Sequence, residues 1–187
     1  MTIAVFAGSS AGNDPAFQEA AAALGRAMAQ RGIALVYGGG FRGLMGTLAD
    51  SVSASGGYVT GVLPESMDNE RVRLKAVESE LIIVPGMHER KSLMYSLSDA
   101  FIAFPGGIGT LEELSEIFTW KQLGSHSKNI GLLNVSGFWD PLLSLLDSMT
   151  GQGFLSEAVR DSLIVETDIE KLLDRLSAEE HPVPAKI

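Results

Sequence analysis

DAFIAFPGGIGTLEELSEIFTW, residues 99–120, holds the pattern that decides the fold of this chain. Its short apolar run, 101–104, has the length and the residue types of a buried strand. A glycine-rich break follows at 105–109, and an amphipathic helix is predicted to begin at Thr110. Glycines between a strand and a helix let backbone N–H groups approach an anion, and the positive end of the helix favours that anion. The stretch therefore predicts a strand end followed by a phosphate-binding turn.

Thr110 and Glu113 allow two interpretations that the sequence alone does not separate. Thr110 is a good N-cap, and with Glu113 three residues later it would form the capping box T-x-x-E. Alternatively, Glu113 is a functional carboxylate at the edge of the sheet, beside the phosphate-binding backbone. Glu113 shares a helix side with Trp120, which favours partial burial, whereas Glu112 and Glu116 have the spacing of a solvated face.

The composition narrows the class of protein. The length of 187 residues predicts one domain over 1–187, with a tail after about residue 180 that we expect to be flexible. The 14 basic and 23 acidic residues give a net charge of −9, which argues against general nucleic-acid binding. The lack of cysteine excludes disulfides, a thiolate nucleophile and a zinc–thiolate site.

Targeting and membrane segments are not expected. The first residues, 1–6, run directly into a strand pattern and lack the basic start of a signal peptide. No apolar run approaches the roughly 20 residues that a membrane-spanning helix needs. We therefore expect a soluble cytoplasmic protein without a membrane partner.

Short apolar runs alternate with helical patterns along the chain. Helices are expected from Pro15, with Asp14 as the cap, to Gly32, and then at 44–55, 87–98, from 110, at 138–149 and at 169–176. The polar segment 65–79 is expected to be a loop with at most one helical turn. Strands are expected at 3–7, 33–37, 58–63, 81–84, 101–104, 130–134 and 163–165.

This alternation predicts an α/β, Rossmann-like fold with a mainly parallel sheet and helices on both faces. In such sheets, ligands bind outside the carboxyl ends of the strands, near a reversal of strand order. The turn at 105–109 and a second glycine-rich turn, Gly38–Gly46, both follow expected strands. Both turns should therefore open on the same edge of the sheet.

The second turn, Gly38–Gly46, has no diagnostic nucleotide motif of its own. Neither turn matches G-x-G-x-x-G with an acidic partner, and the ATP-type pattern G-x-x-x-x-G-K-[ST] is absent. A functional interpretation is that the turn binds the phosphate of a mononucleotide. The alternative, which the sequence leaves open, is that the glycines only permit a tight turn between strand and helix.

Arg90 stands out on the helix expected at 87–98. Met87, Arg90, Met94 and Leu97 share one face, which should meet the core. The side chain could extend along the core and reach water with its charged end. Alternatively, it is a partly buried guanidinium that needs a carboxylate or a phosphate as partner. Lys91 lies one position round the helix and is an ordinary solvated charge unless Arg90 is functional.

Metal and serine-hydrolase chemistry are not expected. His88, His126 and His181 are scattered, and none has metal-ligand spacing to another histidine or glutamate. Ser9 and Ser10 follow the first strand, but no G-x-S-x-G elbow surrounds them.

Three motifs occur in order along the chain. They are Gly38-Gly39-Gly40-x-x-Gly43-Leu44-Met45-Gly46, Met87-His88-Glu89-Arg90-Lys91 and Pro105-Gly106-Gly107-x-Gly109-Thr110-x-x-Glu113. Together they resemble the LOG (LONELY GUY) family of cytokinin riboside 5′-monophosphate phosphoribohydrolases, often misnamed lysine decarboxylases. The resemblance covers roughly residues 3–174.

The resemblance implies a Rossmann-like homodimer that hydrolyses the N-glycosidic bond of a nucleoside 5′-monophosphate, cytokinin-type or purine. The products would be the free base and ribose 5-phosphate. It implies no metal and no organic cofactor, and the acidic charge argues against a nucleic-acid partner. Two alternatives stay open: a non-catalytic nucleotide-binding or sensing module on the same fold, and a hydrolase of another phosphorylated ribosyl compound.

By match to the family motifs, Arg90 and Glu113 are the expected catalytic pair. The substrate-binding residues that the resemblance implies are Lys91, Gly106, Gly107, Gly109, Thr110, Glu112 and Thr119. Further residues that it implies are Gly39 and Gly40, together with a glutamate between the third and fourth strands, for which the candidates are Glu65, Glu70, Glu78 and Glu80.

The expected chemistry needs Arg90 and Glu113 in contact at one edge of the sheet. Cleavage of an N-glycosidic bond builds positive charge on the ribose, which a carboxylate can stabilise while it orients or deprotonates water. We expect Arg90 to keep Glu113 ionised by lowering its pKa.

Overall fold

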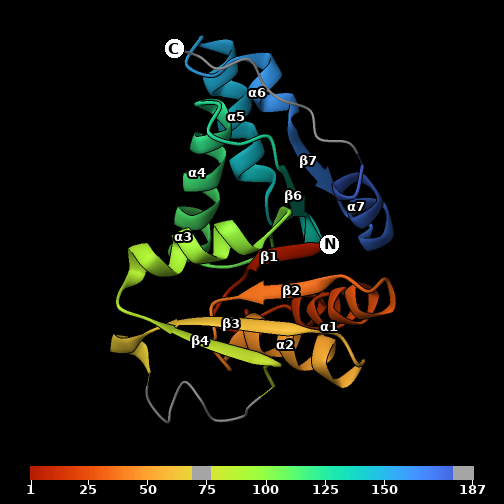
Figure 1. The fold of residues 1–187 in the computed structure, drawn as a ribbon. Helices are drawn as coiled ribbons and strands as arrows, with labels where there is room; N and C mark the ends of the chain where they lie inside the picture. Colours follow the sequence, from red (N-terminus) through yellow and green to blue (C-terminus); the bar gives the residue numbers. More distant parts are fainter. Residues whose placement is uncertain (69–76, 179–187) are drawn as a thin grey trace.

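A computed structural model describes residues 1–68 and 77–178, and a seven-stranded sheet lies at its centre (Figure 1). The strand order is β4-β3-β2-β1-β5-β6-β7, and every pairing of neighbouring strands is parallel. The strands are β1 Thr2–Phe6, β2 Ala34–Tyr37, β3 Val59–Pro64, β4 Glu80–Val84, β5 Ala100–Ala103, β6 Asn129–Leu133 and β7 Leu163–Glu166.

Helices cover both faces of this sheet (Figure 1). Side chains of α1, α2 and α7 pack in one apolar cluster with Ile3 and Val5, whereas α3 to α6 pack in a second cluster with Ala4 and Phe6. Because successive residues of a strand point to opposite faces, the two clusters lie on opposite sides of the sheet. The helices are α1 Pro15–Gln30, α2 Gly43–Ala54, α3 Met87–Leu97, α4 Ile108–Gln122, α5 Asp140–Gly151, α6 Glu157–Asp161 and α7 Ile169–Leu176, with short 3₁₀ turns at η1 Glu65–Met67 and η2 Val135–Gly137.

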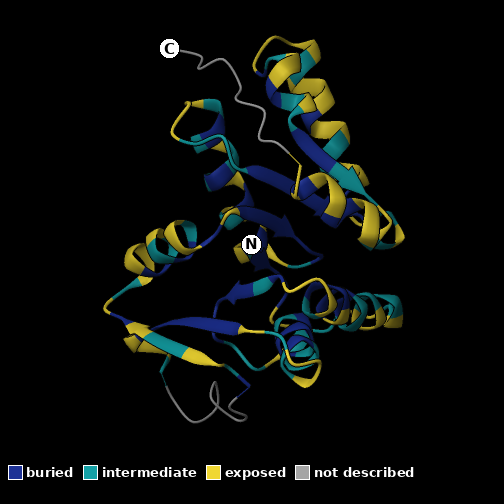
Figure 2. Cartoon of the chain, turned by 45° about the vertical axis from the view of Figure 1, so that its right-hand side comes forward, coloured by how far each residue is buried: buried dark blue, intermediate teal, exposed yellow. Residues whose placement is uncertain are grey.

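Burial is deepest in the middle of the sheet. Strands β5 and β6 are buried along their whole length, whereas the edge strand β4 has exposed positions (Figure 2). Strands covered on both faces read as continuous apolar runs, which is why they were visible in the sequence.

The strand order reverses between β1 and β5. From β1 the chain moves outward through β2, β3 and β4, and it then returns to β5 on the other side of β1. Connections that run in opposite directions lie on opposite faces, as crossovers of a single hand require. The carboxyl ends of β1 and β5 therefore form the switch point at which ligands of such sheets bind.

The structure confirms the predicted α/β, Rossmann-like architecture, and it corrects details. Asp14 caps α1 as expected, because its carboxylate accepts a hydrogen bond from the Ala16 N–H at 2.9 Å. Helix α6 was missed because five residues are too few to show a helical period. Within the described ranges, no helix combines the length and the apolarity that crossing a membrane requires.

Candidate functional site

Helix α4 begins at Ile108, two residues before the predicted start at Thr110. Gly107 is the N-cap residue, and it provides no side-chain hydrogen bond to the helix. Thr110 lies inside the first turn, only 3% exposed. The predicted capping box is therefore wrong, because a residue inside the helix cannot act as its N-cap. Glu113 is left without a capping role.

The first turn of α4 faces open space. A Cβ atom added at Gly107 or at Gly109 would meet nothing within 4 Å, so protein packing does not require glycine at either position. The first amides of a helix, here those of Ile108, Gly109 and Thr110, have no acceptor within the helix. Uncapped amides beside open space form an anion-binding geometry.

Gly106 has a different role from Gly107 and Gly109. A Cβ atom at Gly106 would lie 2.1 Å from Thr110 Oγ1 and 2.8 Å from the Gly8 nitrogen. The Gly8 N–H donates a hydrogen bond to the Pro105 carbonyl at 3.1 Å, which joins the loops after β1 and β5. Gly106 and Thr110 therefore shape the turn by packing. A hollow of about 200 Å³ opens beside it, lined in part by Gly8, Ser9, Ser10, Gly106 and Gly107.

The turn at Gly38–Gly46 is packed against protein. The Gly8 carbonyl accepts hydrogen bonds from the Leu44 and Met45 amides at 3.0 and 3.2 Å, so these first amides of α2 are already used. Gly43 has a φ of +64°, and a Cβ atom there would lie 2.3 Å from the Ser9 carbonyl carbon. These contacts favour the interpretation in which the glycines serve the turn itself.

The glycines at the start of this turn also lie close to other residues. Gly39 has a φ of +70°, and its added Cβ would lie 3.1 Å from Leu63 Cβ. Gly40 lies next to the flexible end of Met45, whose Cε would be 3.3 Å from an added Cβ. Both glycines line the carboxyl end of β2.

Arg90 and Glu113 lie together, with 3.8 Å between Arg90 Nη2 and Glu113 Oε1. Arg90 is 8% exposed, and its Nη1 donates to the Met87 sulfur at 3.3 Å. Its Nε is buried without a hydrogen-bond partner among the residues that the structure describes. This guanidinium is therefore out of water and poorly paired, which is the condition of a group that awaits an anionic or oxygen-bearing ligand.

Gly38 makes room for Arg90, and sequence reasoning did not include it in the site. A Cβ atom at Gly38 would lie 1.8 Å from Arg90 Nη2. The guanidinium thus rests on the backbone at the end of β2. The available signal was a glycine directly after a buried strand, at the edge where ligands bind.

The predicted apolar stripe of α3 is only half right. Arg90 and Met94 are buried, at 8% and 2% exposure, but Met87 and Leu97 are 45% and 38% exposed. Only the middle of α3 is buried against the rest of the fold. The buried interpretation of Arg90 is the one that the structure supports.

Glu113 is a largely buried carboxylate, with 14% of its side chain exposed. Burial raises its pKa to about 7, while Arg90 opposes the rise and Glu112 adds to it. Arg90 lowers this pKa, as expected, but burial raises it more, so the arginine does not keep Glu113 fully ionised at neutral pH. The cost of removing the charge from water exceeds the attraction of a guanidinium 3.8 Å away.

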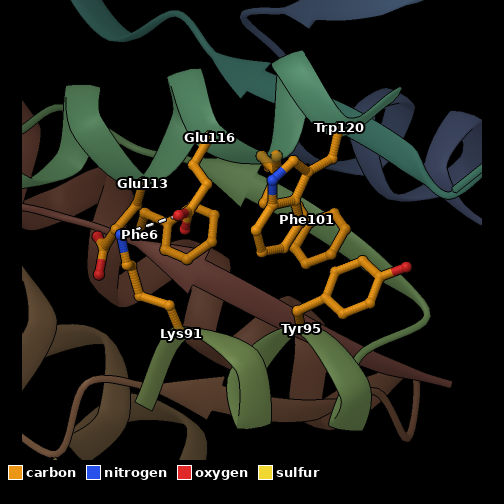
Figure 3. A pocket seen from close by; sticks show the side chains of 8 residues that line it. Phe6, Lys91, Tyr95, Phe101, Glu113, Glu116 and Trp120 are labelled. Carbon is orange, nitrogen blue, oxygen red and sulfur yellow. Dashed lines mark hydrogen bonds and ion pairs between the residues drawn. The ribbon is translucent and has the colours of Figure 1, made fainter. Parts of the chain in front are cut away.

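Lys91 does not extend freely into water, as an ordinary solvated charge would. Its Nζ donates to Glu112 Oε1 at 2.6 Å and to Glu116 Oε1 at 3.0 Å, and its side chain is 12% exposed. Figure 3 shows Lys91 reaching from α3 to α4, with its ammonium beside Glu113 and Phe6. The hydrogen bond to Glu112 raises the pKa of Lys91, and the one to Glu116 acts in the same direction.

The remaining predicted residues of this group are exposed or lie outside the described part of the chain. Thr119 is exposed, its hydroxyl bonds to the Ser115 carbonyl, and it lies about 9 Å along the helix axis from Glu113. Glu80 is exposed at the start of β4, and Glu65 is exposed after β3. Glu70 lies outside the described residues.

Among the described candidates between β3 and β4, Glu78 is the one whose carboxylate is held by hydrogen bonds. Its carboxylate accepts hydrogen bonds from the buried Tyr37 hydroxyl and from the Val77 N–H. Gly61 lies against the Glu78 side chain, where a Cβ would come within 3.0 Å. Burial and this carboxylate raise the pKa of Tyr37. Within the described chain, no group of three or more histidine, aspartate or glutamate side chains is arranged to hold a metal ion.

Solved structures of known proteins share this fold. A molybdenum cofactor binding protein from Rippkaea orientalis matches with a TM-score of 0.70 and 21% identity, over 94% of each chain. The molybdenum cofactor carrier protein from Chlamydomonas reinhardtii matches with a TM-score of 0.70 and 20% identity, over 95% of this chain and 98% of that one. At such identity the likeness establishes the fold alone.

Relatives by sequence are much closer. The cytokinin riboside 5′-monophosphate phosphoribohydrolase LOG from Oryza sativa subsp. japonica is 47% identical over 174 residues, which cover 93% of this chain and 72% of that protein. A cytokinin riboside 5′-monophosphate phosphoribohydrolase from Arabidopsis thaliana is 45% identical over 174 residues, which cover 93% of this chain and 81% of that protein. The family model described as "Possible lysine decarboxylase" matches residues 45–176. The chain belongs to this family, the LOG family.

Proposed function

We propose that this protein hydrolyses the N-glycosidic bond of a nucleoside 5′-monophosphate, cytokinin-type or purine, and releases the free base and ribose 5-phosphate. The relatives named as phosphoribohydrolases support this reaction. One observation carries the proposal: Arg90 is buried and poorly paired beside Glu113, close to a helix N-terminus that faces open space.

The phosphate binds at the first turn of α4 in this proposal. The amides of Ile108, Gly109 and Thr110 donate to its oxygens, and the helix dipole favours its charge. Gly107 and Gly109 let the phosphate approach the backbone, since nothing of the protein occupies the space that side chains would fill. The phosphate then acts as a handle that orients the distant glycosidic bond.

Glu113 supplies the chemical group. With a pKa of about 7 it is roughly half ionised at neutral pH. The ionised form stabilises positive charge on the ribose and accepts a proton from the attacking water. The rate is expected to rise with pH through about 7. Arg90 holds Glu113 in place and donates from its free N–H groups to the bound nucleotide.

A homodimer is part of the same proposal. Exposed apolar side chains gather on α4, where Ile108 is 82% exposed and Leu111 is 37% exposed, and on α3 at Met87 and Leu97. A second copy of this chain would cover these residues and border the site. Light scattering on the purified protein should give twice the monomer mass, and Ile108→Glu should give the monomer.

We also propose a cytoplasmic location and no nucleic-acid partner. The net charge of −9 supports a small ligand over a polyanion. Cell fractionation tests the location. A filter-binding assay with RNA and DNA at low salt should detect no complex.

The test of the function is release of free base. Purified protein is incubated with AMP and with isopentenyladenosine monophosphate, and the products are separated by chromatography. The matching nucleosides, which lack the phosphate, should react at least 100-fold more slowly, because the phosphate handle is missing. No base from any nucleoside monophosphate would overturn the proposal, and binding by calorimetry without product would indicate a nucleotide-binding module.

The role of Glu113 is tested with Glu113→Gln. The amide keeps the shape but cannot accept a proton, so we expect kcat to fall by at least about 100-fold. Glu157→Gln, a change of an exposed carboxylate on α6, is the matched control and should keep wild-type activity. An unchanged rate for Glu113→Gln would mean that this carboxylate is structural.

A further inference from the structure

The facing sides of α3 and α4 carry three negative and two positive side chains. The two positive side chains differ in how closely they contact the carboxylates. Helix α3 presents Arg90 and Lys91, and α4 presents Glu112, Glu113 and Glu116. Lys91 bonds to Glu112 and Glu116 at 2.6 and 3.0 Å, whereas the contact of Arg90 with Glu113 is 3.8 Å long. Two carboxylates are thus tightly held by one lysine, and the third keeps only a loose partner.

The ammonium of Lys91 is already occupied by protein. An ammonium group has three donors, and two of them are used by these carboxylates. Its side chain is 12% exposed, and it lies between the helices beside Glu113 (Figure 3). At most one donor of this buried ammonium remains for a nucleotide, which favours a role within the protein over the role in substrate binding that the family resemblance implies.

We propose that Lys91 is a positioning residue that sorts the charges between α3 and α4. It holds Glu112 and Glu116, so that Glu113 alone is left to face Arg90 and the substrate. This inference rests on the proposed function, because it assigns to Lys91 the control of the group that acts in the reaction.

The surroundings of Glu113 explain why Lys91 matters. The charged groups that face it are Arg90 and Lys91 from α3, and Glu112 and Glu116 from its own helix. Strands β1 and β5 contribute uncharged rings, Phe6 and Phe101, to the same lining. In surroundings of low polarity, charges at this range act strongly on one another. Loss of the lysine would leave two uncompensated carboxylates beside Glu113 and make its ionisation harder.

The test is the pH dependence of kcat/KM for a nucleoside monophosphate, measured from pH 5 to pH 9. For Lys91→Met we expect the rise of activity to move about one pH unit upward, which lowers activity about tenfold at pH 6 but little at pH 9. Lys91→Arg should keep the wild-type profile. The substrate phosphate titrates identically in every variant, so differences between variants report on the protein.

Glu116→Gln provides the opposite change. Removing this carboxylate should move the rise of activity to lower pH, and Lys91→Met/Glu116→Gln should lie between Lys91→Met and the wild type. Glu116→Gln keeps the lysine and its bond to Glu112. It therefore still tests the proposal if Lys91→Met does not fold. An unmoved profile in both single variants would overturn the proposal.

Other roles of Lys91 give other results. If Lys91 binds the nucleotide, Lys91→Met raises KM and leaves the pH profile in place. If Lys91 only ties the two helices, the melting temperature falls without a change in the profile. Either of these outcomes would overturn the proposal.

A carboxyl ¹³C NMR titration of Glu113 separates this proposal from the proposed function, because it needs no substrate. The Glu113 resonance should titrate at higher pH in Lys91→Met than in the wild type. If the protein releases no base and yet the two proteins differ in this way, the proposed reaction is wrong but the role of Lys91 is supported. Equal titration in the two proteins would overturn the sorting itself.

Discussion

The turns at Gly38–Gly46 and at Pro105–Thr110 have similar compositions and opposite surroundings. In the first turn, the Gly8 carbonyl accepts hydrogen bonds from the Leu44 and Met45 amides. Its glycines lie so close to other protein atoms that an added Cβ would contact them. In the second, Gly107 and Gly109 border open space at an uncapped helix end.

The difference shows that a glycine-rich turn after a strand has two physical meanings. Glycine is needed either because protein atoms lie too close for a Cβ or because a ligand must come that close. The space around each glycine separates the two cases: the first turn is built for packing, and the second is open for an anion. Substitutions in the two turns should therefore separate stability from activity.

The largest effect is expected for Gly46→Ala in the packed turn. The new Cβ would lie 1.6 Å from the Phe41 carbonyl oxygen, so the turn or α2 must move. We expect a loss of at least about 3 kcal/mol in the free energy of unfolding, measured by urea titration. Gly151→Ala, at the end of α5 with nothing within 4 Å, is the control. An unchanged urea midpoint would mean that the first turn is not tightly packed.

The next largest effect is the pH dependence of stability that the buried carboxylate of Glu113, one turn after the open turn, should cause. The folded-state pKa of Glu113 is about 7 against an ordinary 4.5, so the folded protein binds this proton more tightly than the unfolded chain does. The resulting stability is fully present below pH 4.5 and is lost as the pH rises through 7. Glu113→Gln should therefore be more stable than the wild type by about 3 kcal/mol at pH 8, with a difference that shrinks toward pH 4.

Urea unfolding at pH 4, 6 and 8 measures this difference. Glu157→Gln, at an exposed position on α6, is the control for a glutamate-to-glutamine change outside the site. A pH-independent difference between Glu113→Gln and the wild type would contradict the raised pKa.

Gly38→Ala should damage activity more than stability, although it lies in the packed turn. The added Cβ would lie 1.8 Å from Arg90 Nη2 and push the guanidinium away from Glu113. We expect kcat/KM to fall about 100-fold, because a displacement of about 1 Å in a catalytic group has that effect. Full activity in Gly38→Ala would show that the position of Arg90 is not critical.

The smallest effect is expected for Gly109→Ala in the open turn. Alanine favours a helix over glycine by up to about 1 kcal/mol, so the variant should be as stable as the wild type or slightly more stable. Its methyl group would enter the space proposed for the phosphate, and KM for AMP should rise about tenfold. An unchanged KM would place the phosphate elsewhere.

Much of the fold could be predicted because it depends on local patterns. The apolar strands, the Asp14 cap and the glycines that end helices are visible within a few residues. The start of α4 was misplaced because Thr110 has the composition of a cap, whereas Gly107 takes that position through its backbone alone. Helix α6 was too short to produce a period.

The candidate site could be predicted only in part. Arg90 was visible as a charge on an apolar stripe, and Glu113 as a carboxylate on a partly buried helix side. The hydrogen bonds from Lys91 to Glu112 and Glu116 depend on how α3 packs against α4. The space beside Gly38 that Arg90 occupies depends on how α3 packs against the end of β2. Neither kind of contact can be seen in a local sequence pattern. The raised pKa of Glu113 depends on the depth of its burial, which no local pattern gives.

The most direct test of the contrast between the turns is an NMR titration of ¹⁵N-labelled protein with ribose 5-phosphate, the proposed product. We predict that the amide signals of Ile108, Gly109 and Thr110 shift in proportion to ligand bound, while those of Leu44 and Met45 stay in place. Shifts at Leu44 and Met45 without shifts at the start of α4 would contradict the account, because they would put the phosphate at the turn that is built for packing.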